Sequence, residues 1–260
     1  MLQNEAFPFL LLSLERAGKA PLQIEFWIDG SMDRTIKIVT ADVRSLTDAR
    51  RFRQLYDRVS PVRRSKVDRM RFQKDKCLSL GAGALLEAAL AAEGVSDFTM
   101  TVSHDGKPRL AHDKNVHFNL SHSGTKVMCA LSDSEIGCDV EQIKESDMKI
   151  AKRFFHPAEY EALMQCGDTE RNGLFFRYWT LKESFMKATG LGLQLPLDAF
   201  CIVLDSRTIR VEQSVDARSY DFRELDFNDG YRYAVCSVDK PLDQFQILPP
   251  SDALLAAAMT

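Results

Sequence analysis

Two acidic residues, Asp139 and Glu141, stand two positions apart in the segment Ile136-Gly137-Cys138-Asp139-Val140-Glu141. Side chains two positions apart in a β-strand point to the same side, so both carboxylates would lie on one face and the apolar residues on the other. Like charges this close repel each other unless a cation lies between them. Since hard cations such as Mg²⁺ take oxygen ligands, the pair indicates either half of a magnesium site or an acidic edge that faces solvent.

A third acidic residue, Glu183, occurs in a stretch that should form a helix ending at Gly190, because glycine often follows the last helical turn. Apolar residues cover most of the circumference of this helix, and such a helix packs on several sides. Trp179, Glu183 and Lys187 nevertheless share one face, since they are spaced four residues apart. Charged groups in apolar surroundings need partners. The alternatives are an ordinary Glu–Lys pair on a solvated stripe and the charged groups of a functional site.

Basic residues crowd into one predicted helix, which begins at Ser60-Pro61 because serine caps a helix and proline fits its first turn. They are Arg63, Arg64, Lys66, Arg69, Arg71, Lys74 and Lys76. Lysine and arginine bind phosphate by charge, so this helix indicates either a cradle for phosphates or a solvated basic face. His122 follows a predicted strand and is either a structural loop histidine or a ligand contact.

Length and composition limit the class of protein. The chain has 260 residues, of which 45% are apolar and 27% charged, and this predicts a packed core in one large domain or two small ones. The net charge of −3 argues against a general nucleic-acid binder. Six cysteines stand far apart without a C-x-x-C pair, so we expect reduced thiols in a cytoplasmic protein rather than disulfides or a zinc site. The apolar run 7–14 is too short to span a membrane and lacks the basic leader of a signal peptide, so no membrane association is expected.

The periodicity of apolar residues predicts the elements that must position these groups. The predicted helices span 45–59, 60–76, 76–92, 147–155, 156–163 and 177–189. The predicted strands span 34–40, 99–103, 117–121, 126–131, 136–141, 195–204, 210–212 and 231–238. Helices and strands therefore mix along the chain, as in α/β (α+β) folds.

The order of strand, helix and further strands occurs twice, and residues 124–131 have a loose echo in residues 230–238. This repetition hints at two related halves that divide near residue 135. We therefore expect four parts, namely an N-terminal extension of unclear role at 1–34, an N-terminal half at 35–135, a C-terminal half at 136–243 and a tail at 244–260.

Five blocks of sequence, in order and at suitable separations, resemble the motifs of the Sfp-type 4′-phosphopantetheinyl transferases. They are Gly106-Lys107-Pro108, Phe118-Asn119-Leu120-Ser121-His122-Ser123, Ile136-Gly137-Cys138-Asp139-Val140-Glu141, Phe154-Phe155-His156-Pro157-Ala158-Glu159, and Trp179-Thr180-Leu181-Lys182-Glu183 with Lys187 and Gly190-Leu191-Gly192-Leu193. The resemblance covers roughly residues 35–243. It implies a monomer of two similar α/β halves, packed with pseudo-twofold symmetry around the site. It also implies that the chain moves the phosphopantetheine arm of coenzyme A to a serine of an apo acyl, peptidyl or polyketide carrier protein, releasing adenosine 3′,5′-bisphosphate.

The resemblance implies roles for the charged residues. Asp139, Glu141 and Glu183 would hold one Mg²⁺ against the pyrophosphate of coenzyme A. Glu183, directly or through a water on the metal, would be the first candidate base for the serine hydroxyl, and Glu159 the second. Lys187 would meet the charge of the pyrophosphate or of the leaving phosphate.

The resemblance also implies which residues bind the coenzyme. They are Arg63, Lys66, Ser79, Lys107, Pro108, Ser121, His122 and Lys187. Ser121 and His122 would bind the 3′-phosphate, and Lys107-Pro108 would lie along the adenine. Many members carry a further Arg or His after the basic helix, where this chain has Lys76-Cys77-Leu78-Ser79, so Lys76 is expected to substitute or Ser79 to bind alone. Apolar residues beside the site, such as Phe154 and Phe155, would contact the carrier.

Two other functions fit the same residues. One is a non-catalytic module that binds coenzyme A or a carrier without transfer, and the intact set of carboxylates and lysine speaks against it. The other is a Mg²⁺-dependent hydrolase that acts on a nucleotide pyrophosphate. Hydrolysis of coenzyme A without any carrier would distinguish the hydrolase from the transferase.

Overall fold

The computed structural model describes residues 36–103, 106–206, 208–242 and 245–247, which all belong to one compact unit, Thr35–Thr260. The predicted extension at 1–34 and most of the predicted tail at 244–260 lie outside the described residues. Within the described ranges, no helix combines the length and the apolar character that a membrane span requires. All six cysteines carry free thiols.

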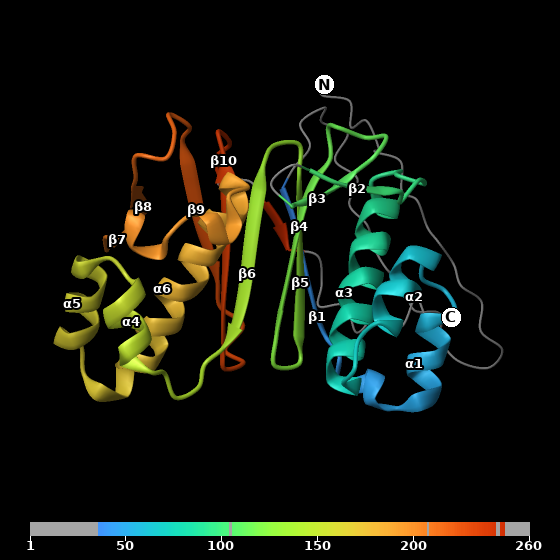
Figure 1. Ribbon diagram of the computed structural model, residues 1–260, viewed down its shortest axis with the longest axis horizontal. Helices are drawn as coiled ribbons and strands as arrows, with labels where there is room; N and C mark the ends of the chain where they lie inside the picture. Colours follow the sequence, from blue (N-terminus) through green and yellow to red (C-terminus); the bar gives the residue numbers. More distant parts are fainter. Residues whose placement is uncertain (1–35, 104–105, 207, 243–244, 248–260) are drawn as a thin grey trace, which may run out of the picture. The chain divides into compact units, whose positions relative to one another are not determined.

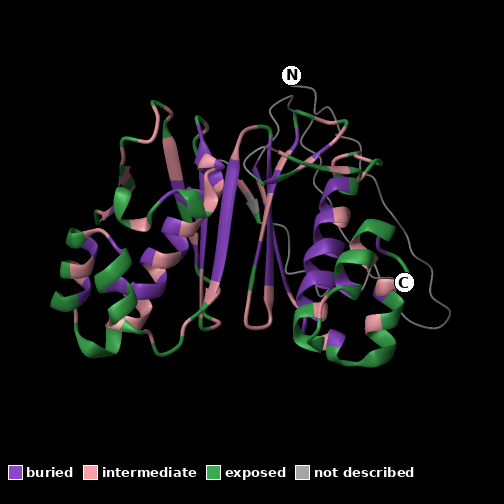
Figure 2. Cartoon of the chain, in the orientation of Figure 1, coloured by how far each residue is buried: buried purple, intermediate pink, exposed green. Residues whose placement is uncertain are grey.

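The N-terminal part of this unit is a sheet covered by a long helix. Its elements are β1 (Ile36–Asp42), α1 (Ala49–Tyr56), α2 (Pro61–Asp68), α3 (Gln73–Ala92), β2 (Met100–Val102), β3 (Pro108–Leu110), β4 (His117–Ser123) and β5 (Lys126–Ser132). The sheet has the order β11-β1-β5-β4, in which β11 (Phe245–Ile247) joins β1 in parallel and the other neighbours are antiparallel. Because α3 is rich in alanine, leucine and glycine, it can bury most of its residues against this sheet (Figure 1, Figure 2).

The C-terminal part repeats this plan with other strands. Its elements are β6 (Ile136–Gln142), α4 (Met148–Phe154), α5 (Pro157–Gln165), α6 (Asp168–Thr189), β7 (Cys201–Leu204), β8 (Ile209–Glu212), β9 (Tyr220–Leu225) and β10 (Tyr231–Val238). The antiparallel sheet has the order β6-β10-β9, while β7 and β8 form a separate two-stranded ribbon. The longest helix, α6, packs on β6 and β10 (Figure 1).

A shared apolar cluster joins the two sheets. It takes Ile38 from β1, Met128 from β5, Cys138 and Val140 from β6, and Val235 from β10. The strands β4 and β6 run next to each other at this junction, and β6 is buried along most of its length (Figure 2). Two sheets that each carry one long helix confirm the predicted mixed α/β fold class.

Some elements differ from the predicted ones. The strand predicted at 195–204 begins only at Cys201, because the residues before it form two short 3-10 turns, Gly192–Gln194 and Leu197–Ala199. Pro196 lies between these turns, and proline has no N–H to donate to a strand ladder. The strands β3, β9 and β11 are absent from the predicted elements. Each is stabilised by a partner strand, as β9 is by its pairing with β10 along its whole length.

Gly137 lies where the backbone of β6 approaches the backbone of α6 closely. A Cβ atom added here would lie 2.0 Å from the Ser184 carbonyl oxygen and 2.5 Å from the Ala188 amide nitrogen. Both atoms belong to the backbone of α6 and cannot swing aside, so we expect Gly137→Ala to lower the free energy of unfolding by about 2 kcal/mol in denaturant titrations. Gly173→Ala is the control, because its Cβ would meet only the mobile end of Arg232. A loss no larger than that of the control would contradict this packing.

Candidate active site

Three acidic residues interact through their charges where β6 and α6 are in contact. The neighbours of Asp139 on β6 point into the shared core, so Asp139 and Glu141 point to the other side of the strand, toward α6. Glu183 belongs to α6, the helix that packs on this side of β6. Burial raises the pKa of Glu183, and the negative charges of Asp139 and Glu141 raise it further. The three carboxylates therefore lie within electrostatic range of one another.

Lys187 supplies the positive charge of this group. Its ammonium nitrogen lies 2.7 Å from Asp139 Oδ1 and 3.1 Å from the Cys138 carbonyl oxygen. Burial alone would lower the pKa of Lys187, but the attraction of Asp139 outweighs burial and raises this pKa. Lys187 is therefore charged at neutral pH, and the site contains a fixed cation one helical turn from Glu183.

One oxygen of Asp139 meets no donor among the described residues. The residue is only 3% exposed, and this oxygen is its buried Oδ2 atom. An unpaired buried carboxylate oxygen is costly, and it is the kind of ligand that Mg²⁺ takes. In the part of the chain that the structure describes, no three His, Cys, Asp or Glu side chains stand together as a ready metal site. The donor chemistry fits a divalent cation, and the ligand set of Asp139, Glu141 and Glu183 stays a prediction.

The charge of Glu141 should couple folding stability to pH. Burial raises the pKa of Glu141, and the negative charge of Asp139 raises it further. The Ser123 hydroxyl, which donates to Oε2 at 2.6 Å, partly offsets this rise. The folded protein thus keeps a proton that the unfolded chain releases, so wild type loses stability as the pH rises above the ordinary carboxyl range. In EDTA, we expect Glu141→Gln to gain stability relative to wild type as the pH rises through and above the ordinary carboxyl range, in denaturant titrations. A difference that does not vary with pH would contradict this environment.

Strand β4 lines the site opposite α6. The Ser121 hydroxyl donates to Asp139 Oδ1 at 2.7 Å, just as Ser123 does to Glu141. Ser121, predicted as a contact of the 3′-phosphate, is therefore placed beside the carboxylates and orients one of them. Ser123 belongs to the site but not to the predicted residues, although its alternation with Ser121 along β4 was the signal that could have identified it.

The predicted phosphate contacts form a row from α2 to α6. Partial burial lowers the pKa of His122, and the positive charges of Lys187 and Lys66 lower it further, so His122 lies within electrostatic range of both amines. Burial lowers the pKa of Lys66, and the positive charge of Arg63 lowers it further. Arg63 Nη1 donates to the Ser79 carbonyl oxygen at 3.4 Å. The structure thus brings five predicted residues into one positively charged row.

Gly83 leaves space for the Arg63 side chain of this row. The row also contains the buried Ser79 hydroxyl, which meets no partner among the described residues. The Arg63 side chain crosses α3 at Gly83, where an added Cβ would lie 2.0 Å from Arg63 Nε. Burial lowers the pKa of Arg63, as expected for a guanidinium held against a helix. An anionic ligand at this place would satisfy both groups.

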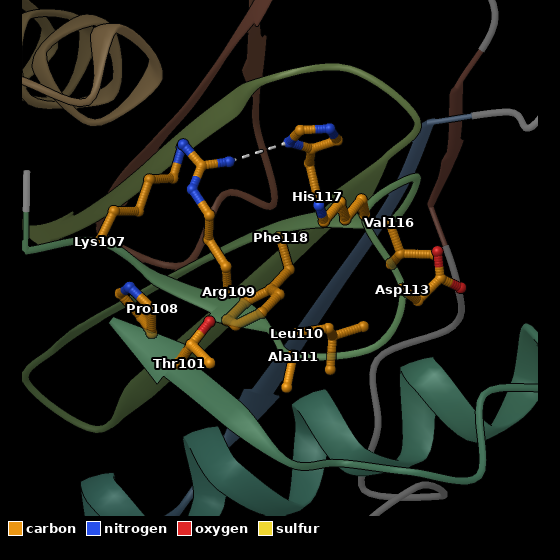
Figure 3. A pocket seen from close by; sticks show the side chains of 11 residues that line it. Thr101, Lys107, Pro108, Arg109, Leu110, Ala111, Asp113, Val116, His117 and Phe118 are labelled. Carbon is orange, nitrogen blue, oxygen red and sulfur yellow. Dashed lines mark hydrogen bonds between the residues drawn. The ribbon is translucent and has the colours of Figure 1, made fainter. Parts of the chain in front are cut away.

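Lys107 and Pro108 differ in their surroundings. Instead of facing a ligand, the Lys107 ammonium donates to Glu135, to the Ile136 carbonyl and to the Lys187 carbonyl, at 2.9, 2.9 and 3.0 Å. Pro108 is exposed and borders a cavity of about 280 Å³ that β3 and the start of β4 line (Figure 3). Pro108 is therefore accessible to an adenine ring. The ammonium of Lys107 is instead bound to groups of the protein itself.

Glu159, the second candidate base, lies apart from the carboxylates on α5. Its Oε1 accepts from Lys182 Nζ at 2.6 Å and from the Ile202 amide at 2.7 Å, while Oε2 accepts from the His156 amide at 3.0 Å. Both charged side chains of the Glu159–Lys182 pair are fully buried. With its two oxygens occupied and no access to solvent, Glu159 is placed to hold α5, α6 and β7 together rather than to take a proton from a substrate.

Comparison with known proteins gives one consistent result. Residues 135–236 match the family described as the 4′-phosphopantetheinyl transferase superfamily. The chain is 33% identical over 183 residues to 4′-phosphopantetheinyl transferase Sfp of Bacillus subtilis, covering 69% of this chain and 82% of the relative. It is 31% identical over 211 residues to 4′-phosphopantetheinyl transferase psf-1 of Bacillus pumilus, covering 78% and 90%. It is 36% identical over 133 residues to 4′-phosphopantetheinyl transferase gsp of Aneurinibacillus migulanus, covering 51% and 55%.

Proposed function

The chain belongs to the Sfp-type 4′-phosphopantetheinyl transferases, and from this premise we propose that it transfers the 4′-phosphopantetheine arm of coenzyme A to a serine hydroxyl of an apo carrier protein. The observation that carries the proposal is the electrostatic interaction of Glu183 with Asp139, Glu141 and Lys187, together with the Lys187 ammonium placed 2.7 Å from Asp139 Oδ1. A transfer between phosphate esters needs such charges more than it needs a covalent catalyst, because its main demands are positioning and neutralisation.

The reaction exchanges one bond for another. The serine oxygen forms a bond to the phosphorus that carries the pantetheine, and the bond from that phosphorus to the bridging oxygen of the pyrophosphate breaks. Adenosine 3′,5′-bisphosphate leaves with the bridging oxygen, and Glu183 accepts the serine proton.

We propose that Asp139, Glu141 and Glu183 hold Mg²⁺. When bound, the ion polarises the attacked phosphorus and offsets the charge of the leaving group. The buried Oδ2 atom of Asp139, which has no donor among the described residues, supports this assignment. The hydroxyls of Ser121 and Ser123 each hold one carboxylate oxygen and so orient the ligands. The ammonium of Lys187 would bind the phosphate oxygens.

The nucleotide end of coenzyme A would follow the positively charged row. Arg63, Lys66 and His122 would bind the 3′-phosphate, and the Ser79 hydroxyl, which meets no partner among the described residues, would donate to it. Pro108 would lie against the adenine, next to the cavity in Figure 3. The substitution of Lys76 for the further basic contact of the family stays a prediction.

The second substrate is an acyl, peptidyl or polyketide carrier protein. Of the two phenylalanines expected to contact it, Phe155 is only 3% exposed and packs against Phe175 and Trp179, so it belongs to the core. Phe154 is 43% exposed and stays a candidate contact. We further propose that the enzyme is a cytoplasmic monomer that binds neither nucleic acid nor membranes; the six free thiols and the net charge of −3 support this view.

Mass spectrometry of the carrier tests the proposal. We expect an apo carrier protein to gain the mass of one phosphopantetheine group after incubation with the protein, coenzyme A and Mg²⁺, and to gain none when EDTA removes the metal. Release of adenosine 3′,5′-bisphosphate without any carrier would indicate a hydrolase instead. Tight binding of coenzyme A with no mass gain on acyl, peptidyl and polyketide carriers would indicate a non-catalytic module.

A further inference from the structure

Lys107 carries a buried charge that the proposed reaction does not use. Its side chain is 8% exposed. The ammonium lies 2.9 Å from Glu135 Oε2, 2.9 Å from the Ile136 carbonyl oxygen and 3.0 Å from the Lys187 carbonyl oxygen. An ammonium has three protons to donate, and a buried charge is tolerated only where such acceptors satisfy it. These contacts therefore hold the ammonium at one place.

One of these acceptors is at the end of the catalytic helix. The Lys187 carbonyl belongs to the last turn of α6, which ends at Thr189 before Gly190. Carbonyl groups in the last turn have no partner within the helix, and a cation is favourable at this negative end of the helix dipole. Lys107 supplies both the donor and the charge, although it comes from the segment before β3, far away in sequence.

The other two acceptors are at the start of β6. Glu135 precedes β6 and Ile136 is its first residue. At the next residue, Gly137, the backbone of β6 lies so close to that of α6 that an added Cβ would meet it. Lys107 thus joins the strand and the helix at their contact. Two residues further along β6, Asp139 Oδ1 accepts from the Lys187 ammonium at 2.7 Å.

Glu135 is itself anchored to strands β3 and β4. Its Oε1 accepts from Arg109 on β3, and it lies 3.2 Å from His117 Nδ1 on β4. Figure 3 shows Arg109 reaching toward His117 in the cavity beside Pro108. Burial alone would raise the pKa of Glu135, but its three basic partners outweigh burial and hold this pKa well below the usual range. Glu135 therefore remains charged, and it connects Lys107 to both β3 and β4.

We propose that Lys107 is a positioning residue of the transferase, whose ammonium fixes the end of α6 against the start of β6 and so sets Lys187 opposite Asp139. The inference rests on the proposed function, because Lys187 acts on phosphate only in that reaction. It reverses the expectation that the charge of Lys107 binds coenzyme A. Loss of the ammonium should therefore slow transfer at saturating coenzyme A more than it weakens coenzyme binding.

A double-mutant cycle on the transfer reaction tests this role. We expect Lys107→Met to lower kcat by about tenfold or more, because small misplacements of catalytic groups have effects of this size, and to change the KM for coenzyme A by less than about threefold. In a Lys187→Ala background, Lys107→Met should have little further effect, since the residue it positions is gone. Lys114→Met is the matched control, because Lys114 lines the same cavity and is exposed.

The outcomes of this cycle separate the possible roles. Equal losses in the wild-type and Lys187→Ala backgrounds would mean that Lys107 only stabilises the fold, and would overturn the proposal. A large rise in KM at unchanged kcat would mean that Lys107 contacts the coenzyme, and would also overturn it. If Lys107→Met does not fold, Glu135→Gln, which removes the charge of one acceptor, should lower kcat in the same direction by a smaller factor.

Hydrogen exchange on the full chain tests the same proposal without using activity. Lys107→Met should speed amide exchange in the last turn of α6 and at the start of β6, while the first turns of α6 and the Lys114→Met control keep wild-type rates. Unchanged exchange at the end of α6 would overturn the positioning role. If wild type transfers nothing to any carrier, the proposed function fails, and the exchange rates still decide whether Lys107 holds α6.

Discussion

Replacing Glu183 by glutamine is expected to lower the rate of transfer to a carrier protein by at least about 100-fold, because the variant loses both a base and an anionic ligand for Mg²⁺. The fold should persist. Burial and the charges of Asp139 and Glu141 disfavour the ionised form of Glu183, so a neutral side chain of the same shape relieves repulsion. Glu183→Gln should therefore unfold at the same or a higher denaturant concentration than wild type at neutral pH in EDTA.

A control on the same helix shows whether the effect belongs to the site. Glu170 lies in the first turn of α6 and is exposed, so Glu170→Gln should transfer at nearly the wild-type rate. Rates are best compared as single turnovers followed by mass spectrometry of the carrier, with Mg²⁺ in excess. Glu183→Gln enzyme that keeps its fold and still transfers within about tenfold of wild type would refute the assignment of Glu183 as base and ligand.

Replacing Lys182 by methionine is expected to have the largest effect on stability. Lys182 and Glu159 are both fully buried, 2.6 Å apart, and Lys182 also donates to the Phe200 carbonyl oxygen at 2.9 Å. Burial lowers the pKa of Lys182, and the charge of Glu159 opposes this. Methionine would leave the Glu159 carboxylate buried without its cation, which in other buried pairs costs about 3–5 kcal/mol. Denaturant titration at neutral pH would measure this loss of unfolding free energy.

A second substitution identifies the source of that loss. In Lys182→Met with Glu159→Gln, no charge remains unpaired, and the single oxygen of the new amide can still accept from one of the two backbone amides, that of Ile202 or that of His156. This double variant should recover part of the stability that Lys182→Met loses. Lys152→Met, on the exposed side of α4, is the surface control and should change stability by less than about 0.5 kcal/mol. A Lys182→Met loss as small as that of the control would show that the pair contributes nothing.

Much of the fold could be predicted from the sequence because local patterns determine it. The alternation of Ile136, Cys138 and Val140 with polar residues predicted β6 and the direction of its carboxylates, which the structure confirms. Gly190 predicted the end of α6, and the glycine has the left-handed backbone, φ 82°, that makes it a frequent helix stop. In contrast, β9 and β11 depend on pairing with β10 and β1, strands that no local pattern connects to them.

The site shows the same limit. Residue types and motif order led to Asp139, Glu141, Glu183 and Lys187, and these are brought together because their elements pack on each other. The fate of each lysine could not be predicted in this way. Lys107, Lys182 and Lys187 are all cations in motifs, yet their contacts differ. Lys107 joins α6 to β6, Lys182 forms a buried pair with Glu159, and Lys187 forms an ion pair with Asp139.

By itself, the sequence of this protein determined the family, the elements and the side of each element on which its charged groups lie, because these follow from periods of 2 and 3.6 residues and from motifs that are local in the chain. The tertiary structure alone decided which charges meet. A charge in a buried place must find its partner across the fold, and the partners of Lys107, Lys182 and Asp139 come from segments that only packing brings within hydrogen-bonding distance.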